Sequence, residues 1–91
     1  VLQIKFSKQF SSDWDSIIRY IQKDFGAVYA DKITGELEKI VEILSVFPEI
    51  GKQNLNYKKF RTFIFRKSVI TYTFNSKQII FLRIVDKRNI K

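Results

Sequence analysis

The sequence contains no cysteine and no histidine. Without cysteine, the chain can form neither a disulfide framework nor a thiolate metal site. Without histidine, it lacks a common zinc ligand and the side chain whose pKa best suits proton transfer near neutral pH. We therefore expect no metal, no cofactor and no histidine-based catalysis, and the lack of cysteine fits a cytoplasmic protein.

Long apolar runs are also missing, since none approaches the roughly 18 residues that a membrane span needs. Residues 1–10 do not resemble a signal peptide, because Lys5 and Lys8 interrupt them. Proline and glycine are scarce, whereas apolar side chains make up 45% of the 91 residues and include nine phenylalanines. This composition favours one packed core, so we expect a single domain over residues 1–91 with no membrane partner.

Acidic side chains are almost absent from the C-terminal part, although the whole chain holds 17 Lys and Arg against 9 Asp and Glu, a net charge of +8. After Glu49 the only acid is Asp86. The cations of this part are Lys52, Lys58, Lys59, Arg61, Arg66, Lys67, Lys77, Arg83, Lys87, Arg88 and Lys91. Because a field of one sign attracts the opposite charge, the sequence predicts an acidic partner.

The N-terminal half predicts one strand and the first helix of a hairpin. Residues 3–10 alternate apolar and polar side chains, which is the pattern of a half-buried strand. Ser12 and Asp15 resemble a capping box, and apolar residues then recur at helical spacing over residues 13–25. Gly26 stands where a left-handed helix cap is expected.

The rest of the chain predicts a second helix and three strands, over residues 28–46, 57–66, 69–74 and 78–85. The separators between the strands are turn-sized, so the strands form an antiparallel meander. Two helices joined by a short connection lie antiparallel and press their apolar stripes onto the sheet. We expect the last strand to be central, with Phe81 and Arg83 on the face opposite the helices. The predicted fold is thus α+β, an antiparallel sheet with the helical hairpin packed on one face.

Four segments in this order carry a resemblance to a known family. They are Phe25-Gly26 after the first helix, Phe-Pro-Glu-Ile-Gly at residues 47–51, the tyrosine-bearing strand at residues 69–74, and the run at residues 80–88. Together they resemble the RelE/ParE superfamily of bacterial toxins over nearly the whole chain. The resemblance implies the predicted fold. It also implies a type II toxin held inactive by a cognate antitoxin, whose acidic or amphipathic segment wraps it.

One branch of this superfamily cleaves mRNA on the ribosome. For that branch the resemblance implies Lys58, Lys59 and Arg61 from the basic strand and Arg88 near the end of the sequence. Attack by a 2′-hydroxyl needs a proton acceptor, a proton donor and cationic stabilisation of the transition state. However, Val69 stands where such nucleases carry an arginine, and no Tyr or His follows Arg88. Two expected catalytic parts are therefore missing.

The other branch poisons DNA gyrase by binding and needs no nucleolytic residues. Arg83, Asp86 and Arg88 near the end of the last strand resemble this branch at least as well. The resemblance therefore leaves two alternative targets, DNA gyrase and the ribosome with its mRNA. Charge alone leaves a third alternative, a non-toxic basic module that binds nucleic acid.

Five residues are further candidates for binding, namely Trp14, Arg66, Lys67, Arg83 and Lys87. Interleaved basic and aromatic residues suit nucleic acid, although basic side chains also protect an edge strand from aggregation. Trp14 lies on the apolar stripe of the first helix, where packing is its simpler role and contact with gyrase or antitoxin the alternative. Both the catalytic and the binding assignments require the cations of the final strands to gather on one accessible surface.

Overall fold

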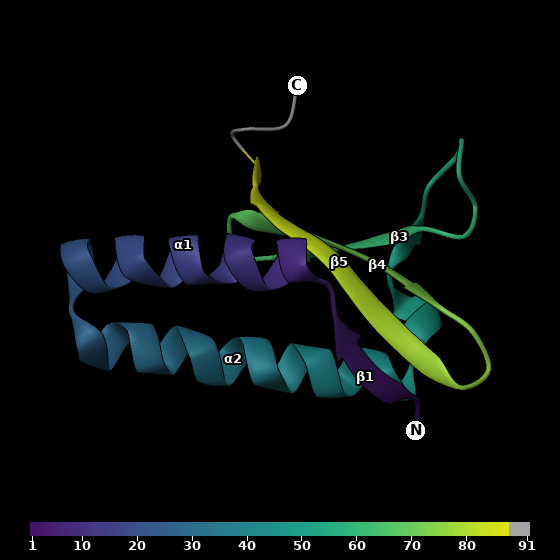
Figure 1. Ribbon diagram of the computed structural model, residues 1–91, viewed down its shortest axis with the longest axis horizontal. Coiled ribbons are helices and arrows are strands. Elements are labelled where there is room, and N and C mark those ends of the chain that lie inside the picture. The colour runs from purple at the N-terminus through teal and green to yellow at the C-terminus, as the bar shows by residue number, and fades with distance from the viewer. Residues whose placement is uncertain (88–91) are drawn as a thin grey trace.

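A computed structural model describes residues 1–87, so the candidate Arg88 lies outside the described residues. The elements are β1 (Gln3–Phe6), α1 (Lys8–Phe25), α2 (Ala27–Val46), the 3-10 turn η1 (Pro48–Ile50), β2 (Lys52–Gln53), β3 (Arg61–Phe65), β4 (Ser68–Phe74) and β5 (Gln78–Asp86). Figure 1 shows the two long helices side by side, with β4 and β5 crossing beside them. The predicted α+β class with a helical hairpin on the sheet is confirmed.

The five strands form one sheet in the order β1-β5-β4-β3-β2. Strands β2 to β5 pair antiparallel, as predicted, whereas β1 pairs with β5 in parallel. The sheet is therefore mixed, and the prediction of a purely antiparallel sheet is wrong in this detail. Alternation predicts that a segment is a strand but carries no information on the direction of its partner. The sequence also missed β2, whose two residues are too few to show a pattern.

The boundary between β1 and α1 lies earlier than predicted. Ser7 follows the end of β1 and caps α1, because its Oγ accepts a hydrogen bond from the Phe10 amide at 3.0 Å. Ser12 lies inside the helix, so the predicted capping box is wrong. Phe10 is 3% exposed, and its ring centroid lies 5.3 Å from that of Phe6. Phe10, Trp14 and Ile17 recur at the three- and four-residue spacing of a helix, and this period outweighs the strand-like alternation before Phe10.

Gly26 joins the two helices. Its amide donates to the Gln22 carbonyl at 3.0 Å, and its own carbonyl accepts from the Ala30 amide at 3.2 Å. Its φ of 91° is positive, as a glycine cap predicts, but its ψ of 167° is extended, so the predicted left-handed helical cap is wrong. One glycine thus ends α1 and begins α2, which starts one residue before the predicted 28–46.

The predicted strand 57–66 is shorter in the structure, because residues 54–60 form a loop before β3. Asn54 Oδ1 accepts hydrogen bonds from the amides of Asn56 and Tyr57, at 2.8 and 2.9 Å. An asparagine that bonds to the amides beyond it folds the chain into a turn. The predicted strands 69–74 and 78–85 are confirmed as β4 and β5, each longer by one residue.

A β-bulge in β5 decides which side chains reach the core. Thr71 pairs with Arg83 and Tyr72 with Phe81, which leaves Leu82 without a counterpart in β4. Because of this extra residue, Phe81 and Ile84 both face the core, at 0% and 1% exposure. The prediction that Phe81 and Arg83 share a face is therefore wrong.

The cap residue of α1 and a side chain of its second turn form hydrogen bonds to the edge of β5 beyond the end of β1. Ser7 Oγ donates to the Leu82 carbonyl at 2.8 Å, and Asp13 Oδ2 accepts from the Ile84 amide at 3.2 Å. These bonds replace the ladder bonds that a longer β1 would have formed. They fix the position of α1 relative to the bulge.

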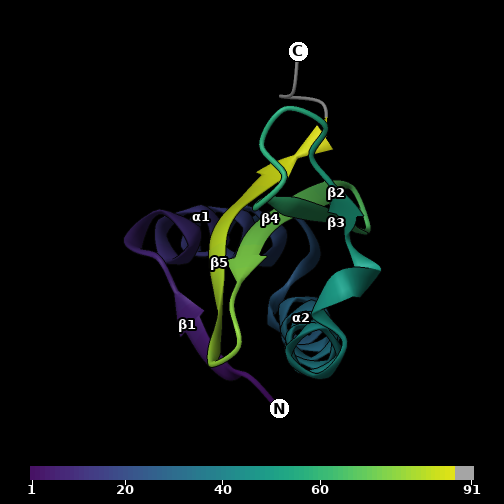
Figure 2. The same ribbon diagram turned by 90° about the vertical axis from the view of Figure 1, so that its right-hand side faces the viewer.

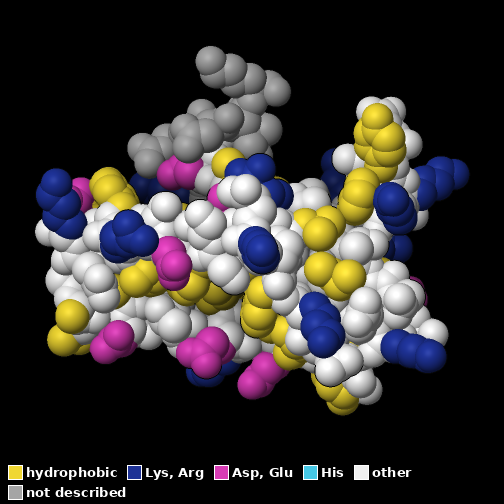
Figure 3. All heavy atoms as spheres, in the orientation of Figure 1, with side chains coloured by type: hydrophobic (Ala, Val, Ile, Leu, Met, Phe, Trp, Pro, Cys, Tyr) yellow, Lys and Arg dark blue, Asp and Glu magenta, His cyan; other side chains and the backbone are white. Residues whose placement is uncertain are grey.

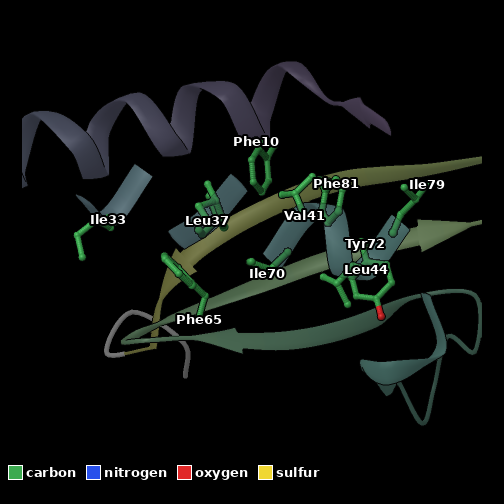
Figure 4. Packing of buried hydrophobic residues seen from close by; sticks show 11 residues of the cluster. Phe10, Ile33, Leu37, Val41, Leu44, Phe65, Ile70, Tyr72, Ile79 and Phe81 are labelled. Carbon is green, nitrogen blue, oxygen red and sulfur yellow. The ribbon is translucent and has the colours of Figure 1, made fainter. Parts of the chain in front are cut away.

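The core lies between the hairpin and the sheet (Figure 4) and comprises Phe10, Ile33, Leu37, Val41, Leu44, Phe65, Ile70, Tyr72, Ile79, Phe81 and Ile84. The Tyr72 hydroxyl donates to the Pro48 carbonyl at 2.6 Å and accepts from the Gly51 amide at 2.9 Å. Burial raises the pKa of Tyr72. A Cβ at Gly51 would clash with this hydroxyl, so the close approach requires glycine.

Candidate binding surfaces

Three of the predicted cations are engaged within the fold, and Arg83 is the first. Its Nε donates to Asp13 Oδ2 at 2.7 Å, which ties β5 to α1. Burial raises the pKa of the Asp13 carboxyl, but the hydrogen bonds from Arg83, Gln9 and the Ile84 amide outweigh it and hold that pKa below its ordinary value. The hydrogen bond to Asp13 in turn raises the pKa of Arg83.

Arg66 is the second engaged cation. Its Nε and Nη2 donate to the two carboxylate oxygens of Glu36 in α2, at 3.0 and 2.8 Å. This bidentate pair lowers the pKa of Glu36 and raises the pKa of Arg66. Arg66 has a φ of 56°, a conformation that tight two-residue hairpin turns demand and that residues other than glycine seldom adopt. The β3–β4 turn is therefore held against α2.

Arg61 is the third. Its Nη1 donates to the carbonyls of Gly51 and Glu49, at 2.8 and 3.2 Å. Its Cζ lies 5.9 Å from the centroid of the Phe74 ring. The guanidinium thus braces η1 and the start of β2 against the sheet.

The described candidate cations of β3 and its flanks fall into two groups. Lys58, Lys59 and Arg61 lie at the start of β3, whereas Arg66, Lys67 and Lys87 lie beyond its end, where the Lys87 amide donates to the Lys67 carbonyl at 2.7 Å. The five residues of β3 separate the groups by roughly 15 Å at the usual rise of a strand. The structure therefore brings Lys67 and Lys87 together and places Lys58 at the other end of the same strand.

An open groove of about 710 Å³ lies between the helical hairpin and the β3–β4 turn, and we call it the turn groove. Trp14, Ile17 and Ile21 of α1 and Phe65 of β3 contribute apolar walls. Arg66 and Lys67 stand at its rim, together with Asp86. The turn groove thus combines an apolar floor with a largely basic end.

A smaller groove of about 380 Å³ lies between α1, α2 and β1. Its walls include Phe6, Phe10 and Leu37, and its rim carries the carboxylates of Asp15, Glu38 and Glu42. Figure 3 shows apolar side chains along the seam between the helices, with acidic side chains beside them. Trp14 lines both grooves and lies 6.5 Å, centroid to centroid, from Phe65. Trp14 therefore packs against Phe65 and is also accessible from both grooves.

The loop of residues 54–60, which we call the basic loop, is a surface that the sequence did not predict, because its second half was assigned to a strand. Leu55 is 88% exposed and Tyr57 is 65% exposed. Lys58 and Lys59 follow directly. Figure 2 shows the loop projecting from the sheet. The asparagines at positions 54 and 56 were the available signal for a turn.

The described residues offer chemistry for binding. Within residues 1–87, no group of three or more His, Cys, Asp or Glu side chains could hold a metal ion. In the same range, no helix is long and apolar enough to cross a membrane. The three engaged arginines anchor elements of the fold, and the accessible features are the two grooves and the basic loop.

Comparison with known families and sequences gives a consistent match. The model of the ParE toxin of type II toxin-antitoxin systems, parDE, matches residues 4–90. Toxin ParE3 of Caulobacter vibrioides is 26% identical over 83 residues, covering 90% of this chain and 83% of the relative.

Solved structures share the fold. The chromosomal ParDE toxin-antitoxin system from P. aeruginosa includes a chain that matches with a TM-score of 0.78 and 19% identity, over 93% of this chain and 95% of that one. A chain of the E. coli DinJ-YafQ toxin-antitoxin complex matches with a TM-score of 0.65 and 15% identity, over 98% and 96%. At these identities the likeness shows the fold.

Proposed function

The chain belongs to the ParE family of type II toxin-antitoxin toxins, and from this premise we propose that it arrests bacterial growth by binding DNA gyrase. The resemblance of Arg83, Asp86 and Arg88 to the gyrase-poisoning branch is the sequence feature that first indicated gyrase as a target. The match over residues 4–90 to the ParE toxin model supports that branch.

The engagement of Arg61 and the valine at position 69 together support gyrase over RNA cleavage. The resemblance to RNA-cleaving members implies cations from both β3 and β4 around the reacting phosphate. Lys58 and Lys59 carry charge before β3, but Arg61 donates to the Gly51 and Glu49 carbonyls, and Val69 supplies no cation from β4. Binding to a protein target does not require cations at these two positions.

We further propose that a cognate antitoxin docks in the turn groove. The related ParDE and DinJ-YafQ structures are of toxin-antitoxin assemblies. An amphipathic helix would lay its apolar face on Trp14, Ile17 and Phe65, and its acidic side chains would approach Lys67. Lys67 forms no ion pair within residues 1–87, so its charge is available to a partner.

Expression of the chain in a bacterium tests the proposed target by what fails first. A gyrase poison stops DNA replication and breaks DNA while translation continues, whereas an RNA-cleaving toxin stops protein synthesis and cuts mRNA at the ribosomal A site. Co-expression of the cognate antitoxin should restore growth. Early translation arrest would contradict the gyrase proposal, and undisturbed growth would favour the non-toxic nucleic-acid-binding module.

A further inference from the structure

The basic loop exposes two large apolar side chains that do not contribute to the core. Leu55 and Tyr57 are 88% and 65% exposed, and neither belongs to the core cluster or packs against it. The Tyr57 ring has one aromatic neighbour, Phe60, at 6.4 Å between centroids. Exposed large apolar side chains that gather on one projecting element are typical of an interaction site.

Hydrogen bonds hold this loop in one shape. Besides the two turn bonds to Asn54 Oδ1, the Gln53 side-chain amide donates to the Lys58 carbonyl at 2.8 Å. Thr73 Oγ1 of β4 donates to the Lys59 carbonyl at 2.7 Å. At the base of the loop, the Asn54 amide donates to the Phe60 carbonyl at 2.9 Å. A loop fixed in this way presents its apolar tip with little entropy left to lose on binding.

The charge around the tip selects the partner. No acid occurs between Glu49 and Asp86 in the sequence. Lys52, Lys58 and Lys59 form no ion pair within residues 1–87. Figure 3 shows Lys and Arg side chains beside the apolar atoms of this projection. Lys59 Nζ lies 5.1 Å from the centroid of the Phe60 ring, which keeps its charge beside the tip. An apolar tip with cations around it complements an apolar pocket with carboxylates at its rim.

We propose that this toxin contacts its target through the basic loop. The target is a protein with a pocket that is lined by apolar side chains and has carboxylates at its rim. This inference rests on the proposed function and names the contact through which it is exerted. Leu55 favours protein over nucleic acid, because leucine has neither a ring to stack on bases nor a group that bonds to their edges. Roughly the length of β3 separates the loop from the turn groove, so the target and the antitoxin contact different elements.

Serine substitutions at the tip test the proposal. Leu55→Ser and Tyr57→Ser remove apolar surface that touches no core residue, so both variants should keep the melting temperature of the wild type. Each should need at least about tenfold more toxin to arrest growth and to inhibit supercoiling by purified gyrase, as hot-spot residues do. The matched control is Val28→Ser, an 87% exposed side chain at the start of α2 that should leave potency unchanged.

Each outcome decides between alternatives. Full potency of both tip variants would overturn the inference while leaving the gyrase proposal intact. A loss confined to Lys58→Gln and Lys59→Gln, with Leu55→Ser as potent as the wild type, would also overturn it and would favour a nucleic-acid contact. Equal losses in Val28→Ser and the tip variants would overturn a specific role of the loop. A wild-type chain that is toxic without affecting gyrase would contradict the proposed target alone, because the growth assay still tests the loop.

Discussion

Single side chains carry much of the organisation of this fold, and Tyr72 is the clearest case. Its hydroxyl connects the Pro48 carbonyl with the Gly51 amide, so β4, η1 and the start of β2 meet at one oxygen. A buried polar group whose partner is removed loses its hydrogen bond and stays desolvated. The sequence did not identify these two partners, because they lie more than 20 positions away from Tyr72.

Tyr72→Phe should therefore lower the free energy of unfolding by about 1–3 kcal/mol, because it leaves a buried amide and a carbonyl unpaired. Urea denaturation measures this change. Tyr20→Phe is the matched control, since its ring is 56% exposed and its hydroxyl makes no hydrogen bond within residues 1–87. A loss in Tyr72→Phe no larger than in the control would contradict the structural role of the hydroxyl.

Asp13 gives the fold a dependence on pH. Its pKa in the folded chain lies below the unfolded value of about 3.9, so the carboxylate stabilises the fold above that pH and the contribution disappears as the pH falls through the folded pKa. The melting temperature of Asp13→Asn should therefore fall less than that of the wild type between pH 6 and pH 3. Asp24→Asn, at an exposed position, is the control and should follow the wild type. Parallel curves for Asp13→Asn and the wild type would contradict this role.

At the scale of elements, the bulge at Leu82 explains most of what the sequence could not show. In β4 the strand is regular, and the side chains of Ile70 and Tyr72, two residues apart, both point into the core. The rule of alternation wrongly assigned Phe81 and Arg83 to one face of β5. The extra residue between them, Leu82, is bound through its carbonyl by Ser7, and alternation within β5 does not reveal that contact. The helical hairpin was predicted to within one residue at α2, where apolar spacing is strong, and failed at Ser7, where strand and helix patterns overlap.

Deletion of Leu82 tests the bulge. Removing the unpaired residue keeps Phe81 and Ile84 on the core face, so the shortened chain should still unfold cooperatively in urea, although the Ser7 bond to the Leu82 carbonyl is lost. Deletion of Ile80 is the matched comparison. It would shift the register of buried residues relative to β1 and β4 and should abolish cooperative unfolding. Equal damage from both deletions would contradict the assignment of Leu82 as the extra residue.

The candidate site was predictable only in part at this scale. In an antiparallel meander the turn after β3 lies next to the end of β5, so the proximity of Lys67 and Lys87 was predictable, and the structure brings them together. The engagement of Arg61 and Arg66 depends on carbonyls and carboxylates supplied by η1 and α2, which are distant in the sequence. The basic loop escaped prediction because its apolar and aromatic residues resemble a strand.

At the scale of the whole molecule, charge is divided along the chain. All acids but Asp86 lie at or before Glu49, whereas the later strands and loops are basic, and the chain carries +8 overall. Such a field accelerates the capture of an anionic partner and is screened by salt.

The association rate constant of the toxin with its cognate antitoxin should therefore fall as NaCl rises from 50 to 500 mM, with a smaller change in dissociation. Stopped-flow fluorescence of Trp14, the single tryptophan, offers a direct signal because that ring lines the turn groove. Lys67→Gln should reduce the salt dependence, and Lys77→Gln, outside the groove, should change it less. An association rate that is independent of salt would contradict electrostatic capture.

The most direct test of the proposed target is a supercoiling assay with purified DNA gyrase, relaxed plasmid and the purified chain. The proposed function predicts that supercoiling falls as the chain is added, that cleaved plasmid accumulates, and that the cognate antitoxin reverses both effects. Normal supercoiling in the presence of excess chain, together with cleavage of mRNA on translating ribosomes, would contradict it.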